Sequence, residues 1–450
     1  MIKKNDIVTI HIENVTNKGF GIGKVQDFVI FTEGGLTGDK LTVRVVKVKK
    51  TYGYGKIVKI QEPSPHRIKS TCPVSDKCGG CQWQHCEYSA QLDFKRNIVI
   101  DALTKIGGIK SPLVESVIGM DKPQPYRNKA VFPIVPKLGG GFEIGMYAPR
   151  SHRIIPIEKC EIQHPIHVDM LTILKKHMEI HDISAYDETI HKGLMRHIII
   201  RTSRATDEVM VILVVNGNGV PHENDLTEAF ALAGATTFVV SRHNTKSNTI
   251  MGSHFRVVTG EGFIKERIGD IWYQLSAPSF FQINPVQTEC LYQIAIQAAD
   301  LDGSQIVIDA HVGVGGVALQ AAHHALEVIG VDVVDEAIHD AKKNAELNGI
   351  ENTRFICGLA EDVIPELLTK SDKTPDVIFL DPPRKGCDNA LLDAIIAAKI
   401  KTVIYISCDP ATLARDVKRL TQNGYVLEMV QPVDLFPMTG KIEVCCKMVI

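Results

Sequence analysis

The sequence predicts an α/β protein in three parts: a small β-barrel over residues 1–62, a central α+β region over residues 63–270 and a C-terminal α/β domain over residues 271–450. Three observations support this division. Short strands separated by glycine-containing turns fill the first part. Longer strands with at least two helices follow, and from about residue 285 apolar strands alternate strictly with helices. Such alternation is typical of a parallel sheet that helices cover on both faces.

The predicted barrel carries cations beside aromatic rings. Lys47, Lys49 and Lys50 stand on the same ribbon as Tyr52 and Tyr54. Lysines can follow a phosphate backbone while aromatic rings stack on bases, so this ribbon suits RNA. The competing interpretation is a basic face that is merely solvated.

The charge distribution also favours a nucleic-acid partner. The net charge of the chain is only −2, but residues 1–70 hold 13 Lys and Arg against 6 Asp and Glu, whereas residues 301–400 hold 8 against 17. A basic module joined to an acidic one predicts that the first meets phosphates. Neither a signal-peptide core nor a run of 18 apolar residues is present. We therefore expect a cytoplasmic protein with no membrane partner, and nothing in the sequence indicates an obligate protein partner.

The central region shows no catalytic motif of its own. A linker with two prolines, EPSPHR, ends the barrel. An amphipathic helix over about residues 88–107 follows and could pack on the catalytic domain. Strands then dominate up to residue 270, with helices near residues 165–180 and 223–233.

A glycine-containing loop opens the C-terminal domain. In IVIDAHVGVGGVAL, Asp309 ends a strand, and Gly313 and Gly315 precede a helix. Glycines here let a ligand approach the backbone at a helix N-terminus. Asp332 ends the next strand, where its carboxylate could hold ribose hydroxyls. The loop alone fits NAD as well as S-adenosylmethionine.

Two further strands end in reactive groups. Asp381 follows one strand in VIFLDPPRKG, and Cys408 follows another in YISCDPATLARD. Ligands of open α/β sheets bind beyond the carboxyl ends of the strands, so both side chains are expected in the crevice that holds the cofactor. A lone cysteine is usually a small buried hydrophobe, but this one precedes a polar, proline-stiffened turn and is predicted to be a nucleophile. Glu443 begins an apolar strand, a position that by itself is usually only a solvated strand end.

Six segments, taken in order, carry a specific resemblance over nearly the whole chain: CPVSDKCGGCQWQH, PYRNKAVFP, CEIQHP, SFFQIN, LDPPRKG and SCDPATLARD. With them the sequence resembles the RNA uracil-5-methyltransferase family, and within it the bacterial 23S ribosomal RNA enzymes that carry an N-terminal TRAM domain and an iron–sulfur cluster. The resemblance implies a class I S-adenosylmethionine methyltransferase domain, which is Rossmann-like. It also implies an OB-like TRAM barrel and a central iron–sulfur region.

The resemblance also implies roles for individual residues. Cys408 matches the family nucleophile and Glu443 its general base. Gln282, Asp332 and Asp381 match positions that contact the cofactor or the target ring. Of the glycine loop, His311, Gly313 and Gly315 are expected to bind the cofactor.

Clustered cysteines in a chain with 11 of them and no export signal point to a metal or to catalysis. The family holds a [4Fe–4S] cluster at the positions of Cys72, Cys78, Cys81 and Cys160. Four thiolates suit zinc as well, and the spacing alone does not separate the two metals. Cys86 is expected to be a free thiol.

Several positions depart from the family pattern. His311 and Val312 replace an aromatic residue and a cysteine, Gly316 stands where Asn or Thr is common, and Asp332 replaces a more frequent Glu. Cys-Asp-Pro and Lys-Ile-Glu also differ from the frequent Cys-Asn-Pro and His-Val-Glu. These changes bear on cofactor affinity. Three other interpretations stay open at this point: a tRNA uridine as the substrate, an RNA-binding or ribosome assembly factor with weak or no catalysis, and a nicotinamide oxidoreductase.

Overall fold

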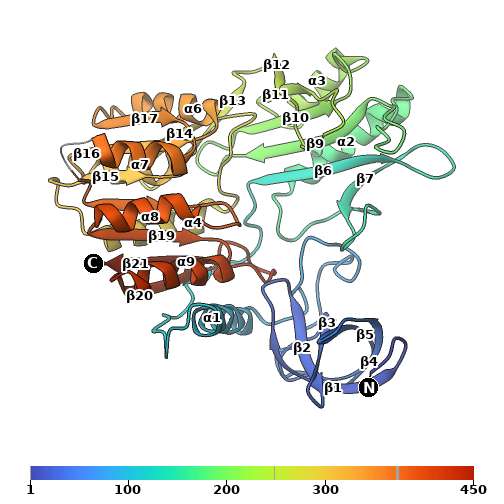
Figure 1. Cartoon of the computed structure of the whole chain (residues 1–450). Helices are drawn as coiled ribbons and strands as arrows, with labels where there is room; N and C mark the ends of the chain where they lie inside the picture. The colour runs from blue at the N-terminus through green and yellow to red at the C-terminus, as the bar shows by residue number, and fades with distance from the viewer. Residues whose placement is uncertain (1, 248, 371–373) are drawn as a thin grey trace.

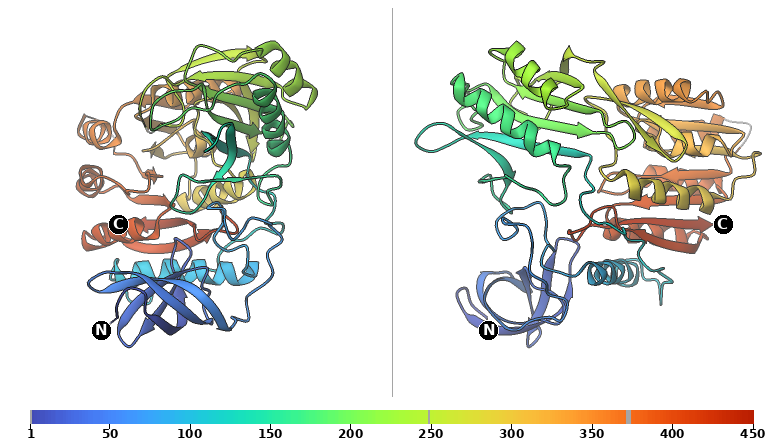
Figure 2. Two further views of the ribbon diagram at one scale, coloured as in Figure 1. Left: turned by 90° about the vertical axis from the view of Figure 1, so that its right-hand side faces the viewer. Right: turned by 180° about the vertical axis from the view of Figure 1, so that it is seen from behind.

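The structure is a computed structural model that describes residues 2–247, 249–370 and 374–450. Figure 1 shows three parts that meet at a common centre. The C-terminal sheet lies on one side, and the carboxyl ends of its parallel strands face the other two parts. The central sheet and the barrel lie one above the other beyond that edge (Figures 1 and 2).

The predicted N-terminal barrel is confirmed. Five strands close in the order β1-β2-β3-β5-β4, and β3 pairs with β5 in parallel. Alternate side chains point inward and fill the interior, among them Ile10, Ile30 and Val43. The strands are β1 (Ile7–Val15), β2 (Phe20–Val25), β3 (Phe28–Glu33), β4 (Lys40–Val48) and β5 (Tyr52–Glu62).

The central part contains a seven-stranded sheet in the order β12-β11-β10-β9-β6-β7-β8. Strand β10 is buried on both faces, which explains its continuous apolar sequence. Strand β9 is equally buried, although it includes Arg196, His197 and Arg201. Its elements are β6 (Lys129–Pro136), β7 (Phe142–Tyr147), β8 (Ile154–Pro156), α2 (Ile166–Ile180), β9 (Met195–Thr202), β10 (Val209–Val215), α3 (Glu223–Leu232), β11 (Thr237–Arg242) and β12 (His254–Thr259).

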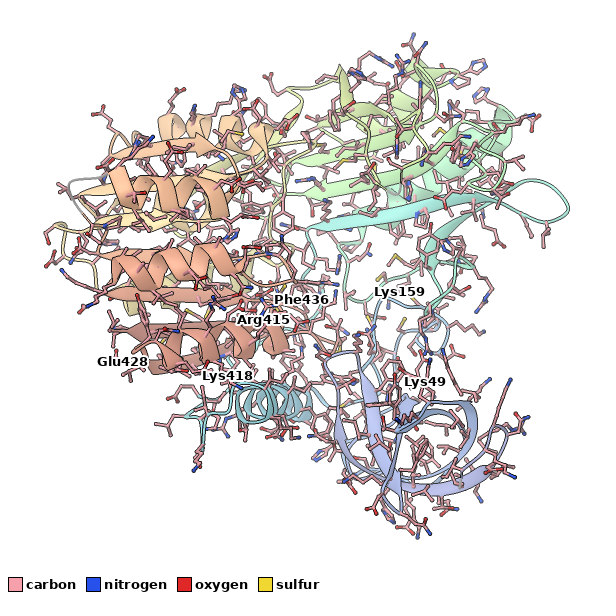
Figure 3. The ribbon with its side chains drawn as sticks, viewed as in Figure 1. Lys49, Lys159, Arg415, Lys418, Glu428 and Phe436 are labelled. Carbon is pink, nitrogen blue, oxygen red and sulfur yellow. The ribbon has the colours of Figure 1, made fainter. Side chains whose placement is uncertain are left out.

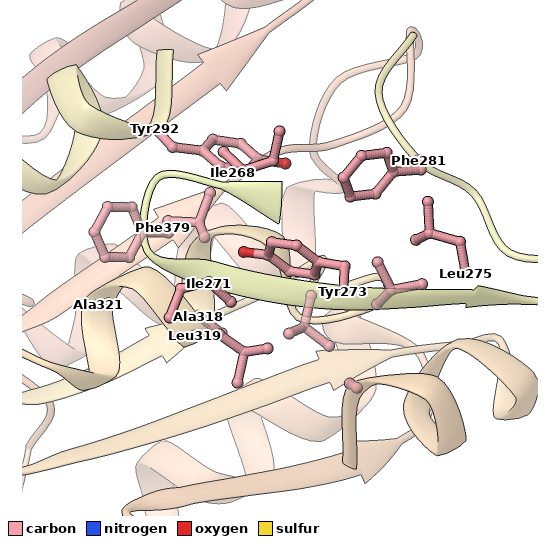
Figure 4. Packing of buried hydrophobic residues seen from close by; sticks show 14 of the residues in the cluster. Ile268, Ile271, Tyr273, Leu275, Phe281, Tyr292, Ala318, Leu319, Ala321 and Phe379 are labelled. Atoms are coloured by element: carbon pink, nitrogen blue, oxygen red, sulfur yellow. The ribbon is translucent and has the colours of Figure 1, made fainter. Parts of the chain in front are cut away.

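Two segments that precede residue 277 pack on the C-terminal domain. Helix α1 (Tyr88–Lys105) lies against helix α9 (Pro410–Gln422), and its Val99 and Leu103 belong to the same apolar core. The hairpin of β13 (Phe263–Ile268) and β14 (Ile271–Ser276) covers another part of that domain. Figure 4 shows its apolar side chains interleaved with those of helix α5 (Gly316–Ala322).

The C-terminal domain has the predicted alternation, with helices on both faces of its sheet (Figure 2). The strand order is β17-β16-β15-β18-β19-β21-β20. The sequence interpretation had named no helix for two segments that prove helical, α7 and α9. The elements not yet given are α4 (Pro285–Ala299), β15 (Ile306–Asp309), β16 (Glu327–Asp332), α6 (Asp335–Leu347), β17 (Thr353–Cys357), α7 (Ala360–Lys370), β18 (Val377–Leu380), α8 (Asn389–Ala398), β19 (Thr402–Ser407), β20 (Val426–Val433) and β21 (Glu443–Val449).

One strand departs from the parallel sheet that the sequence predicts. Strand β21 runs antiparallel to both of its neighbours, β19 and β20. The physical reason is the connection: residues 434–442 join β20 to β21 without a helix, and so short a link cannot make a parallel crossover. As a consequence, β21 begins at the edge where the parallel strands end.

No helix among the described residues has the length and the apolar character that crossing a lipid bilayer requires.

Candidate active site at the carboxyl edge of the C-terminal sheet

Four strand ends converge at this edge. The strand order reverses between β15 and β18, which is where open α/β sheets bind their ligands. Asp309 ends β15, and Asp381 and Cys408 directly follow β18 and β19. Ser407 pairs with Val444, so in the antiparallel register the next residues outward, Cys408 and Glu443, are neighbours. The fold thus joins two residues that the sequence places 35 positions apart.

Glu443 is almost fully buried, with 3% of its surface exposed. Burial, and then the nearby Asp381, raise the pKa of Glu443 well above its ordinary value, while Lys441 and Arg384 act in the opposite direction. Burial also raises the pKa of Asp381 to about 7. Carboxylates in such surroundings are stronger proton acceptors than solvated ones once they are ionised.

Cys408 is half-buried beside these acids. Burial raises the pKa of the Cys408 thiol to about 11, Glu443 and Asp381 add to the effect, and Arg384 opposes it. The free protein therefore holds a thiol at neutral pH, and Arg384 is a cation that favours the thiolate.

These shifts predict the pH dependence of any reaction that starts with the Cys408 thiolate. The Cys408 thiolate becomes more abundant as pH rises, because burial raises the pKa of this thiol to about 11. We expect kcat/KM to increase about tenfold per pH unit between pH 6 and 9, as for one ionisation. Arg384→Ala is expected to shift this rise to higher pH. A flat profile, or a maximum below pH 7, would contradict this account of the site.

The glycine loop is shaped to leave room for a ligand. Gly313 and Gly315 have φ values of 52° and 97°, and a Cβ built on Gly313 would meet no atom within 4 Å. The Gly313 and Val334 amides each donate a 2.9 Å hydrogen bond to the Asp332 carboxylate, which fixes that acid beside the loop. Burial raises the pKa of Asp309, beneath the loop, to about 7.

The structure accommodates the unusual residues of this loop. Val312 is buried, and a side chain at Gly330 would come within 2.8 Å of it. A Cβ on Gly316 would lie 2.6 Å from the Tyr292 hydroxyl, so this tyrosine takes the space that a larger residue would need. His311 is half-buried, and burial lowers the pKa of its imidazole to about 4. At neutral pH it is therefore an uncharged ring on the wall of the crevice.

The motifs PYRNK and SFFQIN meet at the N-terminus of helix α4. The Asn128 side chain donates to the carbonyl oxygen of Gln282 (3.1 Å), and its backbone amide donates to that of Ile283 (2.9 Å). Asn284 caps α4 and donates to the Leu435 carbonyl oxygen at 3.1 Å. These bonds hold Gln282 between the central sheet and the loop that leads to Glu443.

Two positioning residues were missed by the sequence interpretation, although SCDPATLARD contains both. Asp416 is buried and accepts hydrogen bonds from the Cys387 amide (2.9 Å) and the Tyr405 hydroxyl (2.7 Å). Arg415 donates to the Lys385 carbonyl oxygen at 3.0 Å. Together they fix the loop that follows Asp381 and carries Arg384.

The loop before Glu443, residues 434–441, is anchored by a buried ion pair. Lys95 Nζ lies 2.5 Å from an Asp434 oxygen, and neither side chain is exposed. Lys95 also donates to the Phe436 carbonyl oxygen, and Tyr88 donates to Asp434. Figure 3 shows Phe436 at the edge that faces the molecular centre. Helix α1 therefore holds this loop in place.

Breaking this pair is expected to be costly. Lys95→Met leaves the Asp434 carboxylate buried without its cation, which should lower the free energy of unfolding by about 3–5 kcal/mol. Chemical denaturation followed by fluorescence measures the change. Lys418→Met, on the exposed face of α9 (Figure 3), is the matched control and should leave stability within about 0.5 kcal/mol. An equal effect of both variants would show that the buried pair stabilises nothing.

The four predicted ligand cysteines gather between the barrel and the central sheet. Cys81 lies close enough to Cys72, Cys78 and Cys160 for each to oppose its ionisation, and burial raises the pKa of Cys81 to about 12. Cys86 lies apart from them, buried beside Trp83.

The cysteine segment, residues 72–86, is hydrogen-bonded to the loop before Glu443. The Gln82 and Trp83 amides both donate to the Met438 carbonyl oxygen at 3.0 Å, and Met438 adopts a φ of 65°. Its side chain also packs beside Cys81 and Cys160. The sequence alone offered no signal for this contact, because it joins segments about 350 residues apart.

Known proteins resemble the chain over 98% of its length. A family model described as tRNA (Uracil-5-)-methyltransferase matches residues 251–449, and a TRAM domain model matches residues 3–58. An RNA methyltransferase of Halalkalibacterium halodurans, described as uncharacterized, is 44% identical over 98% of this chain and 96% of its own length. The chain belongs to the RNA uracil-5-methyltransferase family. The family-level resemblance drawn from the sequence is thereby confirmed.

A second relative and a solved structure support the same family and fold. An RNA methyltransferase of Clostridium acetobutylicum, also described as uncharacterized, is 41% identical over 98% of this chain and 96% of its own. Among solved structures, the Pyrococcus abyssi tRNA (uracil-54, C5)-methyltransferase in complex with S-adenosyl-L-homocysteine has a TM-score of 0.78 and 28% identity, with 98% and 99% of the two chains covered. The fold is that of an S-adenosylmethionine-dependent methyltransferase with an N-terminal TRAM barrel. The glycine loop alone fitted NAD as well as S-adenosylmethionine, and membership in this family identifies S-adenosylmethionine as the cofactor.

Proposed function

We propose that this RNA methyltransferase forms 5-methyluridine in 23S ribosomal RNA, with Cys408 as the nucleophile and Glu443 as the general base. The observation that carries the proposal is their register: they are neighbours at the carboxyl edge of the sheet, beside the glycine loop. A thiol and an acid of raised pKa in one crevice suit addition to a ring followed by proton removal.

The need for a nucleophile follows from the chemistry of uracil. C5 of uracil is too weak a nucleophile to attack a methylsulfonium, which is the electrophile that S-adenosylmethionine supplies when bound. The Cys408 thiolate adds to C6 and forms an S–C6 bond, while the electrons of the C5–C6 double bond move toward C5 and O4. C5 then has enolate character and would take the methyl group from bound S-adenosylmethionine. The bond between that methyl group and the sulfonium sulfur would break and leave S-adenosylhomocysteine.

Release of the product needs a base. C5 now carries both a proton and a methyl group, and the Glu443 carboxylate removes the proton. The electron pair of the C5–H bond restores the C5–C6 double bond, the S–C6 bond breaks and Cys408 returns as a thiolate. The uridine has to leave its stack to reach Cys408, which costs roughly a few kcal/mol and less in loops.

The cofactor fits the side of the crevice formed by β15, β16 and β17. Exposed apolar side chains follow two of these strands: Val333 and Val334 are 56% and 47% exposed, and Leu359 is 44% exposed. Such a surface suits an adenine ring, and Asp332 lies where ribose hydroxyls would bind. The other residues proposed to contact the cofactor or the target ring are Gln282, His311, Gly313, Gly315 and Asp381.

We propose further that Cys72, Cys78, Cys81 and Cys160 hold a [4Fe–4S] cluster with a structural role. The thiols gather at one place, as a shared group requires. Four thiolates suit zinc as well as the cluster, and the resemblance to the iron–sulfur enzymes is what favours the cluster.

Metal analysis tests the cluster. Protein purified without oxygen is expected to contain about four irons and four sulfides per chain, and Cys160→Ala should lose most of both. Stoichiometric zinc without iron would overturn the iron–sulfur proposal and leave the methylation proposal intact.

Two features bear on which RNA is methylated. The barrel together with the four clustered cysteines resembles the bacterial 23S enzymes. This combination favours ribosomal RNA in the cytoplasm as the substrate. A tRNA uridine is the second candidate, because the Pyrococcus abyssi neighbour of the same full-length architecture is a tRNA enzyme. Comparison of kcat/KM on unmodified transcripts of both RNAs tests the choice. A higher value for the tRNA would overturn the ribosomal proposal.

A further inference from the structure

The TRAM barrel carries an aromatic platform on its outer face. Phe20, Phe31, Tyr52 and Tyr54 come from the neighbouring strands β2, β3 and β5, and all four are half-buried. Their ring centroids are 5.6 to 6.0 Å apart, mostly edge to face. The barrel core does not need these rings, because aliphatic side chains fill its interior. Four clustered aromatic rings outside a core mark a binding surface.

The platform forms one wall of a cleft of about 1090 Å³. The opposite wall is the cysteine segment, with Ser75, Asp76, Cys78, Gln82 and Gln84 among its lining residues. One wall therefore offers flat apolar faces, and the other offers hydroxyl, carboxylate and amide groups that can pair with the edges of a base. This combination matches a nucleobase better than an apolar peptide.

Both cations and carboxylates line the cleft. Lys18 and Arg150 line it together with Glu33 and Asp76. Arg150 forms an ion pair with Glu33, and its guanidinium lies 5.2 Å from the centre of the Phe20 ring. Lys47 pairs across β4 and β5 with Tyr54 and so shares its side of the sheet. Lys49 stands at the top of the barrel, toward the centre of the molecule (Figure 3). The lysines suit a phosphate backbone that enters the cleft.

The cleft lies beside the loop that leads to Glu443. The β1–β2 turn, residues 16–19, lines the cleft. The same turn touches the loop before Glu443, since a Cβ on Gly440 would lie 2.9 Å from both the Asn17 carbonyl oxygen and the Gly19 amide nitrogen. A single RNA strand could therefore cross this turn from one site to the other.

We propose that this cleft is a second base-binding site, which holds unstacked nucleotides of the same single-stranded RNA segment that carries the target uridine. The proposal rests on the proposed function for the identity of the RNA strand. It gives the cysteine segment a role as the fixed wall of a base pocket. The distance between the cleft and Cys408 would then determine which RNA loops bind. A loop has to place the target uridine at Cys408 and a second base on the aromatic platform at the same time.

Photocrosslinking tests this placement directly. 5-Iodouridine is placed singly at successive positions on both sides of the target in a short loop RNA, and crosslinked peptides are identified by mass spectrometry. A few flanking positions are expected to crosslink to peptides that contain Phe20, Phe31, Tyr52 or Tyr54. Crosslinks confined to peptides outside this platform would overturn the proposal.

Variants of Tyr54 provide the second readout. Loss of stacking in Tyr54→Leu should raise KM for the RNA by about 5- to 150-fold, as for one stacked base, with kcat within about twofold. Tyr54→Phe keeps the ring and should behave as the unchanged protein. Val58→Ala, at a residue of β5 that is 52% exposed and does not line the cleft, is the matched control. Equal effects of the leucine and phenylalanine variants would overturn base stacking.

The two proposals can fail separately. The crosslinks and the RNA dissociation constants need no methyl transfer, so they report on the cleft even if no product forms. Conversely, normal methylation by Tyr54→Leu at unchanged KM would overturn the second site and leave the proposed function standing.

Discussion

Cys408→Ala is expected to abolish methyl transfer, by about 10⁴-fold or more, because the proposed bond to C6 is made by the Cys408 thiolate. The measurement is single-turnover transfer of a labelled methyl group from S-adenosylmethionine to unmodified RNA. The dissociation constant for RNA should stay within about threefold of that of the unchanged protein, since the thiol takes part in the reaction and not in RNA binding.

Cys290→Ala is the matched control for this variant. Cys290 lies on helix α4, is also half-buried and takes no part in the proposed chemistry, so its variant should keep its activity. Substantial methylation by Cys408→Ala would remove the covalent mechanism. Equal activity of both variants and the unchanged protein would assign Cys408 the ordinary role of a small buried side chain.

Glu443→Gln is expected to stall the reaction after methyl transfer. The amide cannot take the C5 proton, so the S–C6 bond cannot break, and turnover should fall by about 10²- to 10⁴-fold. A methylated RNA–protein adduct should then accumulate. Denaturing gel electrophoresis detects it as a slower band that carries labelled RNA and the labelled methyl group.

Glu428→Gln serves as the control for the change of charge. Glu428 is exposed on β20, on the outer side of the same sheet (Figure 3), and its variant should turn over normally without an adduct. The double variant Cys408→Ala/Glu443→Gln should form no adduct, because the bond to RNA is made by the thiol. An adduct that lacks the methyl group would place Glu443 before methyl transfer and contradict its role as the base.

Local sequence patterns predicted most of the fold. Alternation of polar and apolar residues marked the barrel strands, and continuous apolar strands marked the C-terminal sheet. Strand ends also placed Asp309, Asp381 and Cys408 at one edge, because parallel strands end together. These features depend on neighbours in the chain and on general rules of sheets, so they can be read without coordinates.

The position of Glu443 could not be derived in this way. Its strand alone indicated a solvated end, and only the resemblance to the family suggested a base. The residue reaches Cys408 because β21 runs antiparallel beside β19. The buried pair of Lys95 and Asp434 is equally invisible in the sequence, since 339 residues separate its members. Contacts of this kind depend on how distant elements pack.

The departures from the family pattern illustrate the same limit. In the sequence, Gly316 is a departure from the family pattern in the cofactor loop. Tyr292, which packs against it, lies on helix α4, before that loop in the chain. In the structure the tyrosine hydroxyl fills the space beside the glycine. The sequence shows the change to glycine, but only the fold shows that Tyr292 fills the space beside it.

The central claim is methylation of uridine C5 in RNA, and nucleoside mass spectrometry tests it most directly. The protein, purified without oxygen, is incubated with S-adenosylmethionine and either unmodified 23S ribosomal RNA or unmodified tRNA, and the digested RNA is analysed. The account predicts 5-methyluridine in the 23S sample, with no product when Cys408→Ala is used. No 5-methyluridine in either RNA, from protein whose four-cysteine site is fully loaded, would contradict it and favour a factor that binds RNA without modifying it.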